Sequence, residues 1–454
     1  MLEKFKQHLF KSYPFLKDKK LLIAVSGGLD SMTLTHLMHQ LNLDIALAHC
    51  NFKLRGNESD ADELFVKNYA TTHNIPFYTT HFDTAKIAEK NKISIQMAAR
   101  DLRYEWFNEL LNKHQYQFLL TAHHLDDMFE TFLINLSRGT GLDGLVGIPQ
   151  INENILRPLL IFTREDISLY AQKEKIEWRE DQSNLTIKYH RNKIRHKVVP
   201  VLKELNPSLL SSFQNTLNHL KNSQEILLNH INDIKDQIII KEAKLNNENI
   251  ILKIVIEKLN RLSHPKNYLF EILKNYGFTE WDDVANLGNA QSGKMVLSKT
   301  HRLIKDRDYL LLTLSPITNT EELNKNKYEI LPNTKSISKP IKLKFQSINP
   351  SKINLKSDSE NCIIIDKDLL KFPLILRKWE KGDYFYPFGM EGTKKLSKFF
   401  KDEKYSIPQK ENTWVLCSEN EIIWVIGKRP DNRFRVSPQT NHILKITIDN
   451  EKIS

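Results

Sequence analysis

The stretch SGGLDS, from Ser26 to Ser31, has the residue types needed to bind a phosphate group. Gly27 and Gly28 have no Cβ atom, so they can form a turn whose backbone N–H groups converge on an anion. The hydroxyls of Ser26 and Ser31 can donate to phosphate oxygens, and the Asp30 carboxylate can hold Mg²⁺ on a bound triphosphate. The spacing is neither that of the Walker A motif nor that of GxGxxG.

A second polar stretch, AHHLDDMFET, holds two carboxylates at helical spacing. Asp127 and Glu130 are three positions apart and would share one face of a helix. Simple capping is the alternative, because carboxylates near a helix N-terminus also complement the helix dipole. His123 and His124 have no third ligand at a spacing typical of metal sites, so a polar site is favoured over a metal site.

The elements around the glycine pair would place it at a ligand-binding edge. The apolar run at residues 21–25 predicts a strand buried on both faces of a parallel sheet, and the spacing of Met32, Leu34 and Leu37 predicts a helix after the turn. Open α/β sheets bind ligands at the carboxyl ends of their strands. An ordinary strand-to-helix turn is the alternative, but two serines and an aspartate in one turn favour a binding site.

Further strands and helices alternate through the first 206 residues. We expect strands at residues 44–49, 75–78 and 118–122, helices at 59–73 and 94–112, and loops at 49–56 and 138–149. Capping boxes are expected at Ser59 with Asp62 and at Thr163 with Asp166. This alternation predicts an α/β domain with a doubly wound parallel sheet over residues 1–206.

The rest of the chain predicts two further domains. Residues 207–315 read as mainly helical, with a long helix at 208–245 and a hairpin pairing 294–297 with 309–314. Residues 316–339 read as a linker. Residues 340–454 read as a small α+β domain, with strands at 341–345, 362–365, 414–417, 422–427 and 442–448 around one helix at 395–404.

Charge and cysteine usage narrow the class of protein. The chain has 66 Lys and Arg against 55 Asp and Glu, a net charge of +11, which favours a polyanionic partner. The run at residues 188–203 has six Lys or Arg and no acid, and residues 341–454 have 21 basic against 15 acidic residues.

Three isolated cysteines indicate neither a disulfide framework nor a zinc site, and no apolar run is long enough to span a membrane. We expect a cytoplasmic protein.

The SGGLDS stretch resembles the signature of the PP-loop, or N-type ATP pyrophosphatase, superfamily, and the wider pattern is similar to the tRNA(Ile)-lysidine synthase family. The matching positions in the first domain are His49, Asn51, Leu54, Arg55, Arg100, Arg103, Tyr104, the segments 122–131, 138–149 and 157–160, Asp181, Ser183, Asn184, Tyr189, Arg191, Asn192 and Arg195. Those in the last domain are Arg377, Gly382, Asp383, Pro387, Gly389 and residues 394–398. One departure is the segment CNFKLRG after the second strand, where a second His and a Gly are expected before Leu-Arg.

The resemblance implies a ligase that joins L-lysine to C2 of the wobble cytidine of a CAU-anticodon tRNA(Ile). ATP would be the co-substrate with Mg²⁺ held through Asp30, and the product would read AUA instead of AUG. The implied ATP-binding residues are Ser26, Gly27, Gly28, Leu29, Asp30 and Ser31. Candidates for catalysis or lysine binding are Asp127, Glu130, Arg103 and Arg138, and candidates for other nucleotide or tRNA contacts are His49, Arg55, Arg100, Arg191, Arg195, Lys394, Lys395 and Lys398. The two later domains would bind tRNA, no membrane is involved, and a homodimer is one of the oligomeric states that the sequence allows.

Three other functions remain open at this stage. A PP-loop tRNA thiolase would adenylate the same kind of oxygen, but Cys50, Cys362 and Cys417 form no catalytic or cluster-binding pattern. A PP-loop amidotransferase would leave the basic C-terminal domain unexplained. A non-catalytic RNA-binding protein would not need Ser26 or Asp30.

Overall fold

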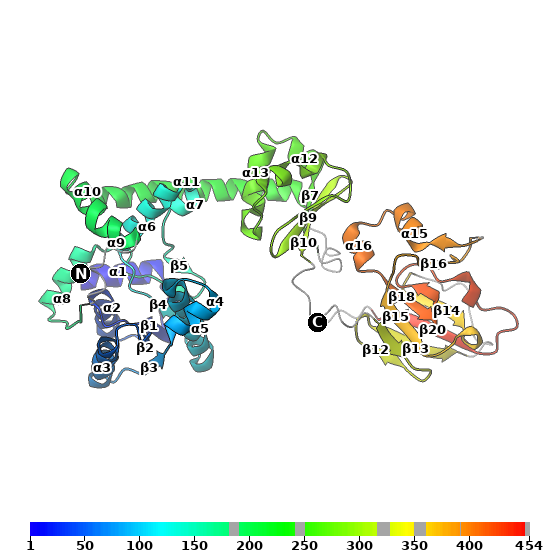
Figure 1. The fold of residues 1–454 in the computed structure, drawn as a ribbon, viewed down its shortest axis with the longest axis horizontal. Helices are drawn as coiled ribbons and strands as arrows, with labels where there is room; N and C mark the ends of the chain where they lie inside the picture. Colours follow the sequence, from blue (N-terminus) through cyan, green and yellow to red (C-terminus); the bar gives the residue numbers. More distant parts are fainter. Residues whose placement is uncertain (181–189, 241–249, 316–326, 349–359, 391, 450–454) are drawn as a thin grey trace. The chain divides into compact units, whose positions relative to one another are not determined.

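The structure is a computed structural model that describes residues 1–180, 190–240, 250–315, 327–348, 360–390 and 392–449 (Figure 1). Contacts divide the chain into two compact units, residues 1–228 and 229–454. The 30-residue helix α11 (Leu209–Ile238) runs across that boundary. Within the described residues, none of the helices is long and apolar enough to cross a membrane.

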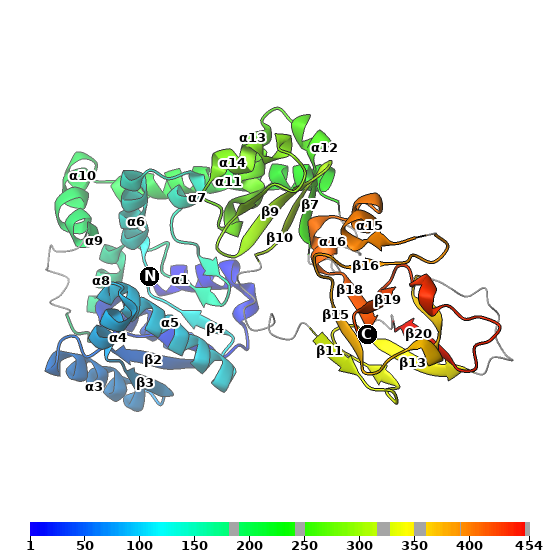
Figure 2. The ribbon, with the colours of Figure 1, turned by 45° about the vertical axis from the view of Figure 1, so that its right-hand side comes forward.

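The first unit is built on a six-stranded sheet with strand order β3-β2-β1-β4-β6-β5. The pairs are parallel except β5 with β6, which is antiparallel. The strands are β1 (Leu21–Ala24), β2 (Ile45–Asn51), β3 (Phe77–His81), β4 (Phe118–Leu120), β5 (Ile151–Asn152) and β6 (Ile155–Leu156). Figure 2 shows β2, β3 and β4 with their neighbouring helices from a second direction.

Helices cover both faces of this sheet. Leu21 and Ile23 point into a core shared with α1, α2, α3 and α8, whereas Leu22 points into the core formed with α5. Consecutive strand residues face opposite sides, so buried residues in succession mark a strand covered twice. The helices are α1 (Leu2–Ser12), α2 (Leu29–Gln40), α3 (Asn57–Thr72), α4 (Thr84–Asn91), α5 (Ile95–His114), α6 (Leu125–Arg138), α7 (Leu142–Leu145) and α8 (Arg164–Lys173). The doubly wound α/β fold expected from the sequence is confirmed.

A further apolar cluster joins α6 to the helices that end the unit. Phe129 of α6 packs with Val199 of α10 (Val199–Leu205) and with Phe213 and Leu217 of α11. Between them lie α9 (His190–Lys193) and the π-helical turn η3 (Ile194–Val198). This packing places one face of α9 and η3 against α6 and thereby sets the position of the basic run.

Local signals in the first unit were predicted with mixed success. The capping box of α8 is confirmed, since Thr163 accepts from the Asp166 N–H group and Asp166 accepts in return. The capping box expected at Ser59 and Asp62 is wrong. The helix α3 begins at Asn57, its N-cap has no side-chain hydrogen bond, and Ser59 Oγ accepts from the Arg55 N–H group instead. The expected loop at residues 138–149 contains the short helix α7.

In the middle of the chain, the long helix expected at 208–245 ends at Ile238, and the sheet is larger than expected. A four-stranded antiparallel sheet has the order β7-β10-β9-β8. Its strands are β7 (Ile250–Val255), β8 (Met295–Leu297), β9 (His301–Asp306) and β10 (Tyr309–Leu314), accompanied by α12 (Ile256–Asn260), α13 (Pro265–Leu273) and α14 (Trp281–Asn286). The expected pairing of residues 294–297 with 309–314 is wrong, because β9 lies between β8 and β10 and pairs with both.

The last part of the chain is a two-sheet α+β fold, and its described residues form a second helix, α16, beside the one expected at 395–404. The sheets have the orders β11-β15-β18-β19 and β12-β13-β20-β14, with an apolar core shared between them, and β16 pairs with β17. The elements are β11 (Lys327–Ile330), β12 (Ser336–Ile337), β13 (Leu343–Ile348), β14 (Cys362–Asp366), β15 (Leu374–Lys378), β16 (Tyr384–Phe385), β17 (Lys394–Lys395), α15 (Leu396–Asp402), α16 (Ile407–Glu411), β18 (Trp414–Ser418), β19 (Glu421–Val425) and β20 (Ile443–Ile448). The linker predicted at 316–339 is wrong over its second half, where β11 and β12 pair with strands of this fold.

Candidate active site

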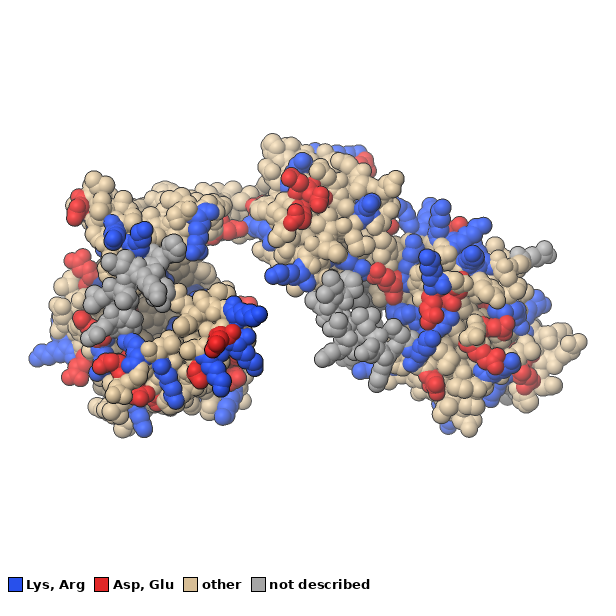
Figure 3. Space-filling view, viewed as in Figure 1, with Lys and Arg blue, Asp and Glu red and all other residues tan. Residues whose placement is uncertain are grey.

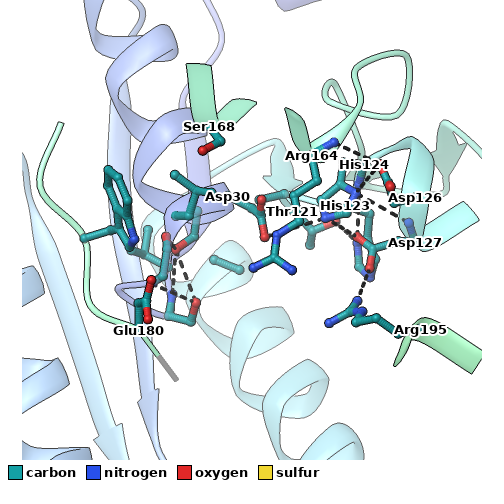
Figure 4. Close-up of a pocket in the computed structure, with 18 of the residues that line it drawn as sticks. Asp30, Thr121, His123, His124, Asp126, Asp127, Arg164, Ser168, Glu180 and Arg195 are labelled. Atoms are coloured by element: carbon teal, nitrogen blue, oxygen red, sulfur yellow. Dashed lines mark hydrogen bonds and ion pairs between the residues drawn. The ribbon is translucent and has the colours of Figure 1, made fainter. Parts of the chain in front are cut away.

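A cleft of about 1230 Å³ opens at the carboxyl edge of the parallel sheet. The glycine turn after β1, the end of β4 and the start of α6 all line it, as do residues of α8, η3 and α10. In Figure 4, Asp30, Thr121, His123 and His124 face one another in its interior, and Arg195 approaches Asp127 from the side. The cleft therefore brings together both polar stretches singled out from the sequence.

The glycine turn is held in shape by its own serines. Ser31 Oγ donates to the Gly28 carbonyl (3.0 Å) and accepts from the Ser26 N–H group (3.2 Å). Gly27 has a φ of 87°, in the region that favours glycine, and a Cβ there would lie 3.5 Å from Val66. Gly28 is the N-cap of α2 and provides no side-chain cap. The N-terminus of α2 therefore points its backbone donors and its dipole towards the cleft, which suits an anion.

Asp30 has the surroundings expected of a carboxylate that holds a cation. Its Oδ1 atom is buried and has no hydrogen-bond partner among the described residues, and its Oδ2 atom lies 3.7 Å from His124 Nε2. Burial raises the pKa of Asp30, although His124 counteracts part of that effect. A buried, unpartnered carboxylate oxygen is costly without a ligand, so this residue fits Mg²⁺ bound with a nucleotide.

Asp127 and Glu130 lie on one face of α6, and two arginines bind them. Arg191 donates to Glu130 Oε2 (2.7 Å) and Asp127 Oδ1 (2.9 Å), and Arg195 donates to Glu130 Oε1 (2.5 Å) and Oε2 (3.0 Å). Glu130 is 2% exposed. Burial opposes ionisation of Asp127, but His124 and Arg191 outweigh it and lower its pKa. The result is a compact network of fixed charges on one wall of the cleft.

His124 connects this network to the glycine turn. It is the N-cap of α6, where Nδ1 accepts from the Asp127 N–H group while the His124 N–H group donates to Asp127 Oδ2. Its Nε2 atom lies 3.7 Å from Asp30 Oδ2 and 3.5 Å from Asp127 Oδ2. His124 and Asp127 therefore cap the N-terminus of α6 and also form part of the site.

A third group of charges flanks the glycine turn on the side of α3. Asp62 accepts from Arg179 Nε at Oδ1 (2.5 Å) and from Arg55 Nη2 at Oδ2 (2.7 Å). Arg179 also donates to Glu58 (2.8 Å), and its backbone N–H group donates to the Gly27 carbonyl (3.0 Å). Asp62 thus holds two arginines at the cleft instead of capping a helix.

The departure from the family pattern lies beside Arg103. Phe52, which follows β2, stacks on Phe82, and the Arg103 guanidinium lies 5.1 Å from the Phe52 ring centre. Phe52 and Arg103 both line the cleft. Asn51 is buried, and its side-chain amide donates to Asp60 (2.8 Å) and Glu63 (2.9 Å) of α3.

Several predicted site residues lie elsewhere. Among the residues that the structure describes, His49, Arg100 and Arg138 do not line the cleft. His49 is buried, and burial lowers its pKa. Its Nδ1 lies 2.9 Å from the carbonyl of Val25, which follows β1, so this residue links β2 to the end of β1. Arg138 ends α6 at the surface. Lys394, Lys395 and Lys398 belong to the second unit, and Asp181, Ser183, Asn184 and Tyr189 lie outside the described residues.

Other residues of the cleft were not predicted as site residues. One group of them comes from α8 and the segment after it and includes Arg164, Ser168, Gln172, Trp178, Arg179 and Glu180, and others include His196 and Lys203. The sequence signal for the later ones is the basic run at residues 188–203, which favours a phosphate-rich partner such as RNA. Arg191 and Arg195 instead turn into the cleft, because positions four apart on a helix share a face.

Comparison with known proteins identifies the family. Family models match three parts of the chain: a PP-loop domain at residues 1–202, a TilS substrate binding domain at 246–317 and a TilS substrate C-terminal domain at 374–447. Among solved structures, the U34-tRNA thiolase NcsA from Methanococcus maripaludis matches 48% of this chain and 79% of its own, at 18% identity and a TM-score of 0.40.

Curated relatives match nearly the whole chain. The tRNA(Ile)-lysidine synthase of Parabacteroides distasonis is 38% identical over 446 residues, covering 98% of this chain and 99% of its own. The enzyme of the same name from Bacteroides thetaiotaomicron is 38% identical over 441 residues, covering 96% and 97%. With all three domains matched in order, this chain belongs to the tRNA(Ile)-lysidine synthase family.

Proposed function

We propose that this protein joins L-lysine to C2 of the wobble cytidine of tRNA(Ile) with a CAU anticodon, using ATP and forming lysidine. The observation that carries the proposal is that one cleft contains both the glycine turn with Asp30 and the carboxylate pair Asp127 and Glu130. The glycine turn with Asp30 suits a nucleoside triphosphate, and the carboxylate pair suits an ammonium group. Family membership supplies the RNA substrate.

In the first step the cytosine O2 would attack the α-phosphorus of ATP, and pyrophosphate would leave. The transition state carries extra negative charge on the phosphoryl oxygens, which the backbone N–H groups at the start of α2 and the Arg103 guanidinium can stabilise. Asp30 would hold Mg²⁺, which supplies additional positive charge to the phosphates. The cytidine then carries AMP at O2.

In the second step the bound ammonium would first lose a proton to water. The resulting lysine ε-amine would attack C2, and AMP would leave with the former O2 atom and the bonding electron pair. Because each carboxylate oxygen can accept two hydrogen bonds, the lysine ammonium can join the arginines already bound to Asp127 and Glu130. The lowered pKa of Asp127 makes it a weak base. We therefore propose ammonium binding and orientation, not proton acceptance, as the role of Asp127.

The thiolase alternative finds no support in the cleft. Of the three cysteines, Cys50 alone lines it, and burial raises the pKa of that thiol to about 12. A thiol that remains protonated at neutral pH is a poor nucleophile.

The direct test is incorporation of radiolabelled lysine into unfractionated bacterial tRNA with ATP and Mg²⁺. We expect label with the intact protein and a loss of at least about 100-fold with Asp30→Ala, since that variant removes the group proposed to hold the metal on ATP. Glu109→Ala, at an exposed position of α5 away from the cleft, is the control. ATP cleavage without any label would overturn lysine as the nucleophile and leave the ATP chemistry intact.

A further inference from the structure

Asp62 is a buried carboxylate shared by two arginines that come from distant parts of the chain. It is 7% exposed, and its two oxygens accept from Arg179 Nε (2.5 Å) and Arg55 Nη2 (2.7 Å). Each arginine side chain is about one third exposed, 34% for Arg55 and 33% for Arg179. Two positive groups thus meet one buried negative group, and Arg179 also pairs with the exposed Glu58 (2.8 Å). Both arginines remain accessible from the cleft that they line.

This group is joined directly to the glycine turn. The Arg179 N–H group donates to the Gly27 carbonyl (3.0 Å), and a Cβ placed on Gly27 would lie 3.8 Å from the Asp62 carbonyl oxygen. A Cβ on Gly28 would lie 4.0 Å from the Arg179 carbonyl oxygen. The backbone of Asp62 therefore lies beside Gly27, and the backbone of Arg179 lies beside both glycines of the turn.

The arrangement of Arg55 and Arg179 around Asp62 suits the binding of a polyphosphate better than a purely structural role. A guanidinium has five N–H donors in a planar fork, and phosphate oxygens are its preferred bidentate partners. A carboxylate that binds two guanidinium groups fixes the direction of both forks before any ligand arrives, which reduces the entropy lost on binding. The α2 N-terminus beside them adds backbone donors for the same anion.

We propose that Arg55 and Arg179 bind the β- and γ-phosphates of ATP and hold the pyrophosphate after the first step, with Asp62 as their positioning residue. This inference rests on the ATP chemistry proposed above and assigns the end of the nucleotide that leaves. The α-phosphate and the reacting cytidine then lie on the other side of the turn, towards Asp30 and Asp127.

The test compares binding of two nucleotides by isothermal titration calorimetry with Mg²⁺ present: α,β-methylene-ATP, which has all three phosphates but cannot be cleaved between the first two, and AMP, which has one. For Arg179→Gln we expect the dissociation constant for α,β-methylene-ATP to rise about 10- to 100-fold while that for AMP stays unchanged. Asp62→Asn should have the same pattern with a smaller effect, because both arginines remain but lose their orientation.

Two further variants make the result specific. Arg179→Lys keeps the charge without the planar fork, so it should restore part of the affinity. Lys173→Gln, at an exposed position of α8 outside the cleft, removes a charge of the same sign and should bind both nucleotides as the unsubstituted protein does. Thermal unfolding of each variant checks that the domain remains folded.

If Arg179→Gln weakened the affinity for α,β-methylene-ATP and for AMP equally, the inference would be overturned, because Arg179 would then support the turn as a whole. Unchanged affinity for both nucleotides would overturn it as well. If the unsubstituted protein bound AMP but not α,β-methylene-ATP, the proposed ATP chemistry would fail together with this inference, so the two failures are distinguishable.

Discussion

The pair Asp127 and Glu130 is the most informative residue-level feature, because it separates the two proposed steps. In Asp127→Asn or Glu130→Gln we expect lysine incorporation to fall by about 100-fold, the effect of removing one partner of a buried charged pair. Pyrophosphate release on addition of tRNA and ATP should persist, since the ATP site lies at the glycine turn. Both rates can be followed in one reaction with labelled lysine and a coupled pyrophosphate assay.

The matched control for that prediction is Asp143→Asn, which removes an acid of the first unit that accepts from Gln224 (2.7 Å) away from the cleft. It should leave both rates unchanged. A parallel loss of lysine incorporation and pyrophosphate release in the Glu130 variant would contradict the assignment of this pair to the lysine step.

Cys50 provides a second prediction at the scale of the residue. A thiol becomes reactive as the thiolate, and burial raises the pKa of Cys50 to about 12, so the thiolate appears only as the pH approaches that value. We expect Cys50 to resist iodoacetamide at pH 7.5 and lysine incorporation to continue after treatment. Mass spectrometry of the treated protein checks the first point, and rapid labelling of Cys50 at pH 7.5 would contradict it.

The predicted site residues that line the cleft come mainly from contiguous motifs. Ser26 to Ser31 are contiguous, and Asp127 and Glu130 are three positions apart, so local spacing was enough to single out each group. Arg179 could not be found in this way, because its partners are Asp62 and Gly27, which lie far from it in the chain. Ser59 and Asp62 show the opposite error, in which a local pattern typical of a cap was overruled by a distant arginine.

At the scale of the element, α8 is a helix whose start supports the cleft. Thr163→Ala removes the hydroxyl that accepts from the Asp166 N–H group (3.0 Å), and we expect the free energy of unfolding of the first unit to fall by about 1 kcal/mol. Thr163→Ser keeps that hydroxyl and should recover most of the loss. Urea unfolding of the whole protein, followed by a probe in the first unit, measures both; equal stability of Ala and Ser variants would contradict the capping role.

Strands were predicted well where burial is two-sided and less well elsewhere. The core strands β1, β2 and β4 have continuous apolar runs, whereas β9 (HRLIKD) and β11 (KYEI) include charged residues that hid them. The charge on β9 has a tertiary cause, because Arg302 is 7% exposed and donates to Thr313 of the neighbouring strand (2.8 Å) and to Glu411 of α16 (3.0 Å). A partner more than one hundred positions away cannot be inferred from the spacing of residues.

At the scale of the molecule, the surplus of positive charge predicts how tRNA binding responds to salt. Figure 3 shows Lys and Arg side chains grouped over the part of the second unit that contains α15 and α16, where the sequence has Lys394, Lys395, Lys398, Lys401 and Lys404. Replacing Lys395 and Lys398 by Gln should reduce the slope of log affinity against log salt by about one for each phosphate that is no longer neutralised. Filter binding of tRNA at several salt concentrations measures that slope.

Lys371→Gln is the control for that prediction, since Lys371 is an exposed lysine of the same unit that pairs with Glu419 and lies outside the α15 group. Its slope should equal that of the unsubstituted protein. An unchanged slope for the double variant would show that Lys395 and Lys398 do not contact tRNA phosphates.

The shared carboxylate of Asp62 also has a consequence for biosynthesis. Asp62 and Arg179 are 117 positions apart, and the backbone of Arg179 closes on Gly27, which is made still earlier. On the ribosome, the glycine turn, β1 and α3 therefore emerge long before the residue that completes their surroundings. A nascent chain that ends before Arg179 has the SGGLDS motif but lacks this arginine. We therefore expect the ability to bind ATP to be gained late in translation, when almost the whole first domain has left the exit tunnel.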